Sequence, residues 1–392
     1  MLMGKECKIE GCCVQSQEFH LKETCNTPDI STLLQDLYQI LFHFPSSILF
    51  FFQDLYKHLI QPKRPSWNIM TTITIAILHA MRSIMVSVSL DFWRRMLRLP
   101  YFVLYDTNTF IAATFEPTHA SLKGVLKNQD AEYIKAEWIL PPESEEEKVI
   151  LFFHGGGYCF KDWFSFIRLS ERLSSYTARA VFAVSYRLAP ETRYPGALFD
   201  AVQSYFHLIE YYKIKPQHIT IIGDSAGGGL AMSLLMYLRD HQYPLPEASV
   251  LLSPWIDLTY QHPSWSESFL VDFLPPRPDK NSIVNPACLY LGLDNYKQLS
   301  SHTYASPLFS NHFENLPPIL IQSGECETMR DEIRVFTKRL QQQQHSTVFR
   351  HEEYEDMVHD FQVFDFPQSF LALKHIQQWL AFCRNDKNGV CL

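Results

Sequence analysis

The chain has 392 residues, of which 46% are hydrophobic, and its 42 acidic and 34 basic side chains give a net charge of −8. This amount of apolar material excludes a chain that is disordered throughout. The acidic balance argues against a nucleic-acid-binding protein, which usually presents a basic face. Nine cysteines lack the Cys/His spacing of a zinc site, so we expect no metal and favour a reducing compartment.

The N-terminal part of the chain carries two expected helices. The first 30 residues are charged throughout and lack the apolar core of a secretory signal. Residues 31–61 are predicted to form a very apolar helix, uncharged from Leu37 to Gln53 and divided by Pro45. We interpret this segment either as an interfacial membrane anchor, or as a lid over an active site or part of the core. Residues 66–97 are predicted as a second helix, whose polar stripe indicates packing against other parts of the protein.

From about residue 130 onward, short apolar runs rich in β-branched residues alternate with longer helical patterns. This alternation predicts an α/β fold, with a mostly parallel sheet covered by helices on both faces. We therefore expect an N-terminal helical cap or anchor region over residues 1–130 and an α/β domain over residues 131–392. The expected strands are 131–140, 149–153, 180–186, 218–223, 248–253, 318–324 and 346–353, and the expected helices are 162–179, 196–213, 226–241, 328–343 and 367–383.

A serine stands in the small-residue turn GDSAG, residues 223–227, directly after an apolar strand and before a helix. This is the context of a nucleophile elbow, in which a tight turn presents a serine hydroxyl at the C-terminal edge of a sheet. A structural glycine-rich turn is the alternative, but the strand before and the helix after favour the nucleophile. The pattern therefore predicts Ser225 as the nucleophile.

A glycine triplet leaves the strand 149–153 in the run HGGG, about 70 residues before the serine. Without Cβ atoms, backbone N–H groups of such a loop can face a cavity. Together with the amide after the serine, they could bind the oxyanion of a tetrahedral intermediate. A flexible glycine loop is the alternative. The candidate oxyanion-hole residues are Gly155, Gly156, Gly157 and Ala226.

The nucleophile also needs a base and an acid that orients it. His359 lies in MVHDF, between the last expected strand and the last helix, where a sheet-edge loop can reach the serine. The acid should follow the strand 318–324, and the chain order serine, acid, histidine is that of an α/β-hydrolase triad. The carboxyl groups available there are Glu325, Glu327, Asp331 and Glu332.

These motifs together resemble the hormone-sensitive-lipase-like group of α/β-hydrolase esterases, over about residues 130–384. The family's acid opens a pattern like Asp-x-Leu-x-Asp-Glu, which begins with Glu327 here, so the resemblance implies Glu327 as the acid with Asp331 in reserve. It also implies Gly156, Gly157 and Ala226 as the main oxyanion donors. The matching motifs are HGGGY (154–158), YRLAPETRYPGALFD (186–200), GDSAGGGLA (223–231), SPWIDLT (253–259), ETMRDE (327–332) and MVHDF (357–361).

The resemblance implies a serine ester hydrolase that forms an acyl-enzyme and needs neither a metal nor an organic cofactor. The chain is also similar to fungal steryl acetate hydrolases and arylacetamide deacetylases, which carry an N-terminal membrane segment. We therefore expect a hydrophobic ester substrate, such as a lipid or steryl ester, and association with a membrane such as the endoplasmic reticulum, with the cytoplasm as the alternative. An arylacetamide-type deacetylase or amidase and a non-catalytic small-molecule-binding relative are the rival functions. Retention of His359 argues against the non-catalytic relative.

Overall fold

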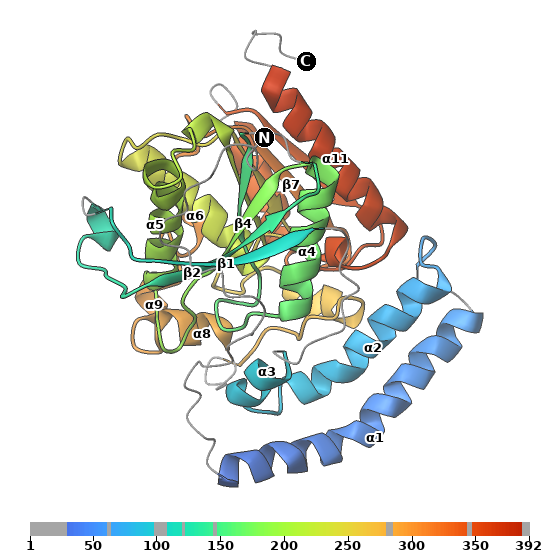
Figure 1. Ribbon diagram of the computed structural model, residues 1–392. Helices are drawn as coiled ribbons and strands as arrows, with labels where there is room; N and C mark the ends of the chain where they lie inside the picture. Colours follow the sequence, from blue (N-terminus) through green and yellow to red (C-terminus); the bar gives the residue numbers. More distant parts are fainter. Residues whose placement is uncertain are drawn as a thin grey trace.

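The computed structural model describes residues 30–60, 64–97, 108–119, 122–143, 147–279, 285–342 and 347–385. Its centre is one eight-stranded sheet in the order β1-β2-β4-β3-β5-β6-β7-β8 (Figure 1). β1 and β2 run antiparallel to their neighbours, and the other strands pair in parallel. The predicted α/β fold is thereby confirmed. The strands are β1 (Thr109–Phe115), β2 (Ile134–Leu140), β3 (Val149–Phe153), β4 (Ala180–Ser185), β5 (Ile219–Asp224), β6 (Ala248–Leu252), β7 (Ile319–Gly324) and β8 (Phe349–Tyr354).

The central strands are apolar along their whole length because helices cover both faces of the sheet. Every residue of β3, with the sequence VILFF, is buried. In the parallel register, Phe153 at the end of β3 lies opposite Gly223 of β5. The two glycine-containing loops that follow these strands therefore leave the sheet side by side, at the same edge.

Two groups of helices form the outer layers. α4 and α11 share one apolar core with one face of the sheet, and α5, α6 and α10 share a second core with the opposite face. Three short helices lie in the long connection between β6 and β7. The bounds are α4 (Trp163–Thr177), α5 (Gly196–Glu210), α6 (Ala226–Asp240), α7 (Ser264–Glu267), α8 (Pro286–Leu291), α9 (Tyr296–Leu299), α10 (Arg330–Gln342) and α11 (Pro367–Asn385).

The N-terminal region departs from the sequence expectations in two places. The helix expected over 66–97 is divided into α2 (Ile69–Met85) and α3 (Leu90–Met96), because Ser89 caps the second helix by accepting a hydrogen bond from Phe92 N at 3.2 Å. Strand β1 was not expected, since its apolar run over residues 110–113 is short and half alanine, a residue depleted in strands, and its side chains are mostly exposed or half-buried. It extends the sheet at its antiparallel edge.

α1 (Ile30–Ile60) is the outermost element and packs along α2, which lies between α1 and the body of the protein (Figure 1). Buried Trp67, just before α2, and buried Ile75, within α2, share a small apolar core with Met357 and Val358, which directly precede His359. α2 therefore covers the loop that carries the predicted base. Among the described residues, no helix is both long enough and apolar enough to cross a membrane.

Candidate active site

Ser225 occupies a strained turn between β5 and α6. Its backbone has φ 52° and ψ −120°, outside the regions that most residues adopt, as expected for a nucleophile elbow. Its backbone carbonyl accepts hydrogen bonds from Trp255 N at 2.8 Å and Gly229 N at 3.1 Å. The turn requires glycine at 227, where a Cβ atom would stand 2.0 Å from the carbonyl oxygen of Phe153. These contacts fix the serine at the sheet edge.

The structure places the predicted base directly against this serine. His359 Nε2 lies 2.9 Å from Ser225 Oγ, although the two residues are 134 positions apart in the chain. Both residues are buried, with exposed fractions of 6% for Ser225 and 2% for His359. A hydroxyl and an imidazole at this separation are placed for proton transfer.

Glu327 is the predicted acid that faces the histidine. Its Oε2 lies 3.4 Å from His359 Nδ1, which is long for a hydrogen bond, although such contacts often tighten when substrate binds. Burial raises the pKa of Glu327 to about 7, against the opposing effect of His359. The reserve acid, Asp331, instead accepts a hydrogen bond from Ser264 N at 3.0 Å and pairs with Arg330. The geometry therefore favours Glu327 over Asp331.

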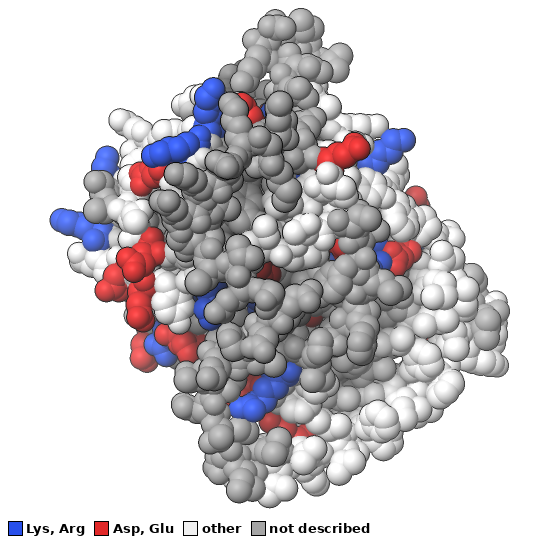
Figure 2. All heavy atoms as spheres, viewed as in Figure 1, with Lys and Arg blue, Asp and Glu red and all other residues white. Residues whose placement is uncertain are grey.

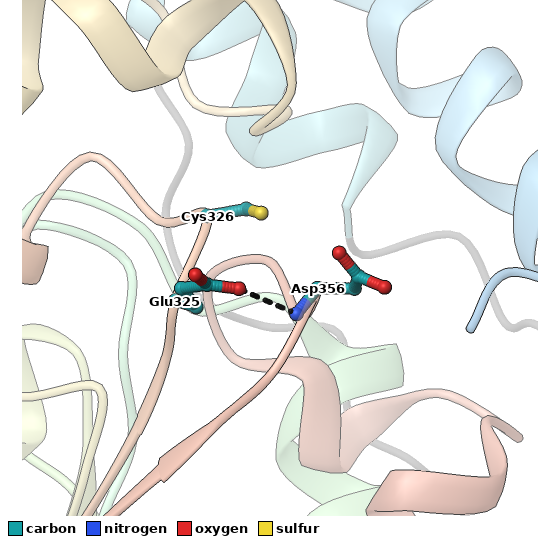
Figure 3. A group of neighbouring side chains, drawn as sticks. All are labelled: Glu325, Cys326 and Asp356. Carbon is teal, nitrogen blue, oxygen red and sulfur yellow. Dashed lines mark hydrogen bonds between the residues drawn. The ribbon is translucent and has the colours of Figure 1, made fainter. Parts of the chain in front are cut away.

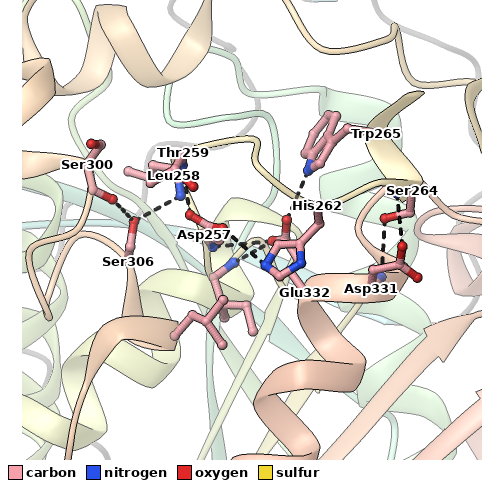
Figure 4. A network of polar contacts seen from close by, with 12 residues as sticks. Asp257, Leu258, Thr259, His262, Ser264, Trp265, Ser300, Ser306, Asp331 and Glu332 are labelled. Carbon is pink, nitrogen blue, oxygen red and sulfur yellow. Dashed lines mark hydrogen bonds and ion pairs between the residues drawn. The ribbon is translucent and has the colours of Figure 1, made fainter. Parts of the chain in front are cut away.

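The other two carboxyl groups after β7 have different partners. Glu332 is fully buried and accepts hydrogen bonds from Ile256 N and Trp265 Nε1, within the network of Figure 4. This network anchors the SPWIDLT segment that follows β6. Glu325 accepts a hydrogen bond from Asp356 N at 3.1 Å. Both therefore support the loops around the site.

The glycine loop after β3 lies against the elbow, where a Cβ atom added to Gly155 would stand 3.0 Å from Ser225 Cβ. However, Gly155 N donates to Asp224 Oδ2 at 2.9 Å. We therefore remove Gly155 from the predicted donors, because its N–H is already engaged. In the part of the chain that the structure describes, no acceptor takes up the amides of Gly156, Gly157 or Ala226. These three remain the predicted oxyanion donors.

Two further contacts stabilise the glycine loop and the YRLAPE segment. Tyr186 donates its hydroxyl to the carbonyl oxygen of His154 at 2.7 Å. The carboxylate of fully buried Asp200 accepts hydrogen bonds from the backbone and the guanidinium of Arg187. This fits the supporting role that the resemblance implies for the segment and for Asp200.

Sequence reasoning missed one residue of the site, Asp360. Its Oδ2 lies 3.1 Å from His359 Nε2, on the side of the ring that faces Ser225. Burial lowers the pKa of His359, but the carboxylates of Asp360 and Glu327 outweigh burial and raise it well above its usual value. The available signal was the acid that directly follows the histidine in MVHDF.

One cluster of metal-binding side-chain types lies near the site, formed by Glu325, Cys326 and Asp356 (Figure 3). Three of its carboxylate oxygens already have partners, one of Glu325 and both of Asp356. Asp356 Oδ2 accepts a hydrogen bond from Ser66 N at 3.0 Å, and Oδ1 lies 3.8 Å from the guanidinium of Arg64. The Trp67 indole also donates to Asp356 O at 2.8 Å. These contacts explain the cluster as the attachment point of the segment before α2.

Comparison with known proteins agrees with this geometry. Residues 150–363, more than half of the chain, match the α/β-hydrolase-fold family. An acetyl-hydrolase of Streptomyces hygroscopicus is 34% identical over 226 residues, which are 57% of this chain and 71% of that protein. A versiconal hemiacetal acetate esterase of Aspergillus parasiticus is 30% identical over 195 residues, 48% of this chain and 60% of that protein. The crystal structure of an esterase from the bacterial hormone-sensitive lipase family has a TM-score of 0.64 at 29% identity, covering 78% of this chain and 96% of that one. The chain therefore belongs to the α/β-hydrolase family and is a carboxylic ester hydrolase of its hormone-sensitive-lipase-like group.

Proposed function

We propose that the protein hydrolyses carboxylic esters through a covalent acyl-enzyme on Ser225, with His359 as general base and Glu327 as the acid that orients it. The observation that carries this proposal is the 2.9 Å separation of Ser225 Oγ and His359 Nε2 in a strained turn at the sheet edge. The unengaged amides of the neighbouring glycine loop support it.

The reaction proceeds in two halves. His359 Nε2 takes the proton of Ser225 Oγ as this oxygen bonds to the ester carbonyl carbon. The amides of Gly156, Gly157 and Ala226 hold the oxyanion, and its collapse breaks the carbon–oxygen bond while His359 gives its proton to the leaving alcohol. Water, deprotonated by His359, then attacks the acyl carbon. The acid leaves, and the serine hydroxyl is restored.

Turnover of p-nitrophenyl butyrate, with labelling by a fluorophosphonate, tests the assignment. We expect Ser225→Ala to abolish both. Ser233→Ala is the matched control, since Ser233 is a buried serine of α6, the helix that follows Ser225, and its hydroxyl donates to Gly229 O. That variant should keep labelling and turnover. Labelling that persists in Ser225→Ala would contradict the proposal.

We further propose that the substrate is a hydrophobic ester, such as a lipid or steryl ester. The aromatic surroundings of the base support this, since the ring of Phe273 lies 6.2 Å from that of His359. A panel of p-nitrophenyl esters of increasing chain length tests it, and a preference for the shortest, most polar ester would contradict it. An acetanilide in the same panel separates an esterase from an amidase.

We also propose that α1 lies on a lipid surface, so that the N-terminal region up to residue 130 combines a cap with a membrane-facing helix. The two acids of α1 point inward, Asp36 to Ser89 and Asp54 to His79. Figure 2 shows uncharged atoms along the edge that α1 occupies in Figure 1. The large apolar side chains that α1 exposes are Leu34, Leu37, Tyr38, Leu41, Phe42, Phe44, Ile48, Leu49, Phe50, Phe52, Tyr56 and Ile60.

A lipid surface suits this face better than a second copy of the chain. α1 has 31 residues, so at about 1.5 Å per residue it offers one long, uncharged strip rather than a compact patch. Lys57 follows at its C-terminal end, where a cation can meet anionic headgroups. A helix with an apolar outer face and an inward polar side is the form that lies in a membrane interface.

A further inference from the structure

Asp272, in the connection between β6 and β7, is the buried acid that neither the triad nor the oxyanion loop accounts for. It is fully buried, and its carboxylate reaches both loops of the proposed triad. Oδ2 accepts a hydrogen bond from Thr328 N at 2.7 Å, next to Glu327. Oδ1 accepts one from His359 N at 3.1 Å. One carboxylate therefore ties the acid's loop to the base's loop.

The cost of burying this charge indicates that the contacts matter. Burial raises the pKa of Asp272 above its usual value, and a charged His359 opposes that rise. Hydrogen bonds from backbone N–H groups compensate a buried carboxylate only while the donors stay in place. A displacement of either loop would therefore leave the buried carboxylate without one of its donors. Because this is unfavourable, the carboxylate opposes displacement of both loops.

α2 holds the backbone of Asp272 from the other side. His79 Nε2 lies 3.0 Å from the carbonyl oxygens of both Val271 and Asp272. His79 Nδ1 lies 3.0 Å from Asp54 Oδ2 of α1. The guanidinium of Arg82 adds a contact of 3.4 Å to Asp272 O. A continuous chain of polar contacts thus runs from the outermost helix to the backbone of His359.

We propose that Asp272 is a positioning residue of the triad, which fixes the Glu327 and His359 loops relative to each other, and that His79 of α2 holds Asp272 in place. The inference rests on the proposed function and deepens it. Asp272 acts through the backbone of the two loops and does not touch the reacting atoms. The N-terminal helices thereby become part of the catalytic arrangement rather than an appendage.

The test compares kcat and KM for p-nitrophenyl butyrate in the full chain, per active site titrated with a fluorophosphonate. We expect Asp272→Ala to lower kcat by about 10²-fold with KM changed much less, because displacement of a catalytic group by about 1 Å has an effect of that size. We expect His79→Ala to lower kcat by about tenfold, and His79→Gln, which keeps a donor, to recover part of that loss. The double variant His79→Ala/Asp272→Ala should be no slower than Asp272→Ala alone.

Ser87→Ala, in the segment directly after α2, is the matched control for His79→Ala. It removes the 3.1 Å contact between Ser87 Oγ and His43 Nε2, another polar link from α1 to this part of the chain, which does not reach Asp272. Its kcat should match that of the parent. A similar loss of kcat in Ser87→Ala and His79→Ala would overturn the role of His79.

If Asp272→Ala fails to fold, Asp272→Asn takes its place in the test, since asparagine keeps one acceptor oxygen. Four carboxyl groups face His359, and removal of the charge of Asp272 should move the acid limb of kcat/KM to lower pH. Those groups are Glu327, Asp360, Asp224 and Asp272.

Two results would overturn the proposal for Asp272. One is a kcat per titrated site within twofold of the parent, and the other is a lower melting temperature with an unchanged kcat and pH profile, which marks a structural role only. A folded parent chain that hydrolyses no ester would instead contradict the proposed function. The two failures are therefore distinguishable.

Discussion

His359 carries a carboxylate on each side of its ring, with Glu327 at Nδ1 and Asp360 at Nε2. The first is the arrangement of a serine hydrolase triad, whereas the second competes with Ser225 for the proton that the ring must receive and return. Both carboxylates stabilise the charged imidazolium, which cannot act as a base until it loses its proton. Because the two carboxylates lie at different ring nitrogens, we expect replacement of Glu327 to lower the rate and replacement of Asp360 to move its pH dependence.

Replacement of Asp360 should move the pH profile. Its carboxylate raises the pKa of His359, so Asp360→Asn lowers that pKa and leaves more of the neutral base at acidic pH. We expect the acid limb of kcat/KM to shift to lower pH, measured with p-nitrophenyl butyrate. Glu355→Gln, which removes an exposed carboxyl group nearby, is the control. An unshifted limb in Asp360→Asn would contradict this interaction.

The identity of the triad acid can be tested directly. Glu327→Gln should lower kcat by about 10³- to 10⁴-fold, because an amide cannot stabilise the imidazolium that forms during attack. Asp331→Asn should stay near the parent rate, since Asp331 is engaged with Ser264 and Arg330. Steady-state kinetics on both variants decides between them, and a large loss in Asp331→Asn alone would reverse the assignment.

At the scale of elements, α1 and α2 have different surroundings. α2 lies between α1 and the loop before His359, whereas α1 exposes aromatic and aliphatic side chains along its outer side. Polar contacts join α1 to α2 at Asp54, and to the segment between α2 and α3 at Asp36 and His43. These contacts lie on the inner side of α1, so a change on its outer side should leave the fold intact.

Charges on that outer side should weaken lipid binding. Phe42 and Phe50 are 65% and 55% exposed, so Phe42→Asp/Phe50→Asp should leave the melting temperature nearly unchanged. We expect at least a tenfold loss of cosedimentation with phosphatidylcholine–phosphatidylserine vesicles, since each phenylalanine transferred from water contributes about 1.5–3 kcal/mol. Tyr211→Asp, at an exposed aromatic after α5, is the control. If the parent chain does not bind vesicles and instead self-associates in sedimentation velocity, a second copy of the chain, rather than a lipid surface, covers this face of α1.

At the scale of the whole molecule, the two cores share one sheet, so a buried charge in either layer contributes to the stability of all of it. Asp200 is fully buried beneath Arg187. Asp200→Ala should lower the free energy of unfolding by about 3 kcal/mol, because it removes the buried acceptor of the backbone and guanidinium hydrogen bonds of Arg187 and leaves only the bond to the carbonyl oxygen of Asp130. Urea denaturation followed by circular dichroism measures this. Glu314→Ala, at an exposed ion pair with His312, should change it by less than about 0.5 kcal/mol.

The sequence predicted most of the sheet because its central strands are continuous apolar runs. It predicted Ser225 because a tight turn with glycine follows one of these strands. It predicted His359 because this histidine lies between the last strand and the last helix. β1 was not predicted, because its apolar run over residues 110–113 is short and half alanine. Asp272 and Asp360 were not predicted from the sequence for another reason. Asp272 meets His359 across 87 positions of chain, and Asp360, although it directly follows His359, stands in no motif that assigns it a role. Sequence patterns predict helices, strands and turns, whereas contacts between distant loops can be identified only from the three-dimensional structure.

Ser225 is only 6% exposed, because a tight turn holds it at the edge of the sheet. Few water molecules can contact a serine that is covered to this extent, so solvent competes little for its hydroxyl. The hydroxyl therefore already faces the imidazole before any ester arrives, and the enzyme does not have to order its nucleophile again in each catalytic cycle.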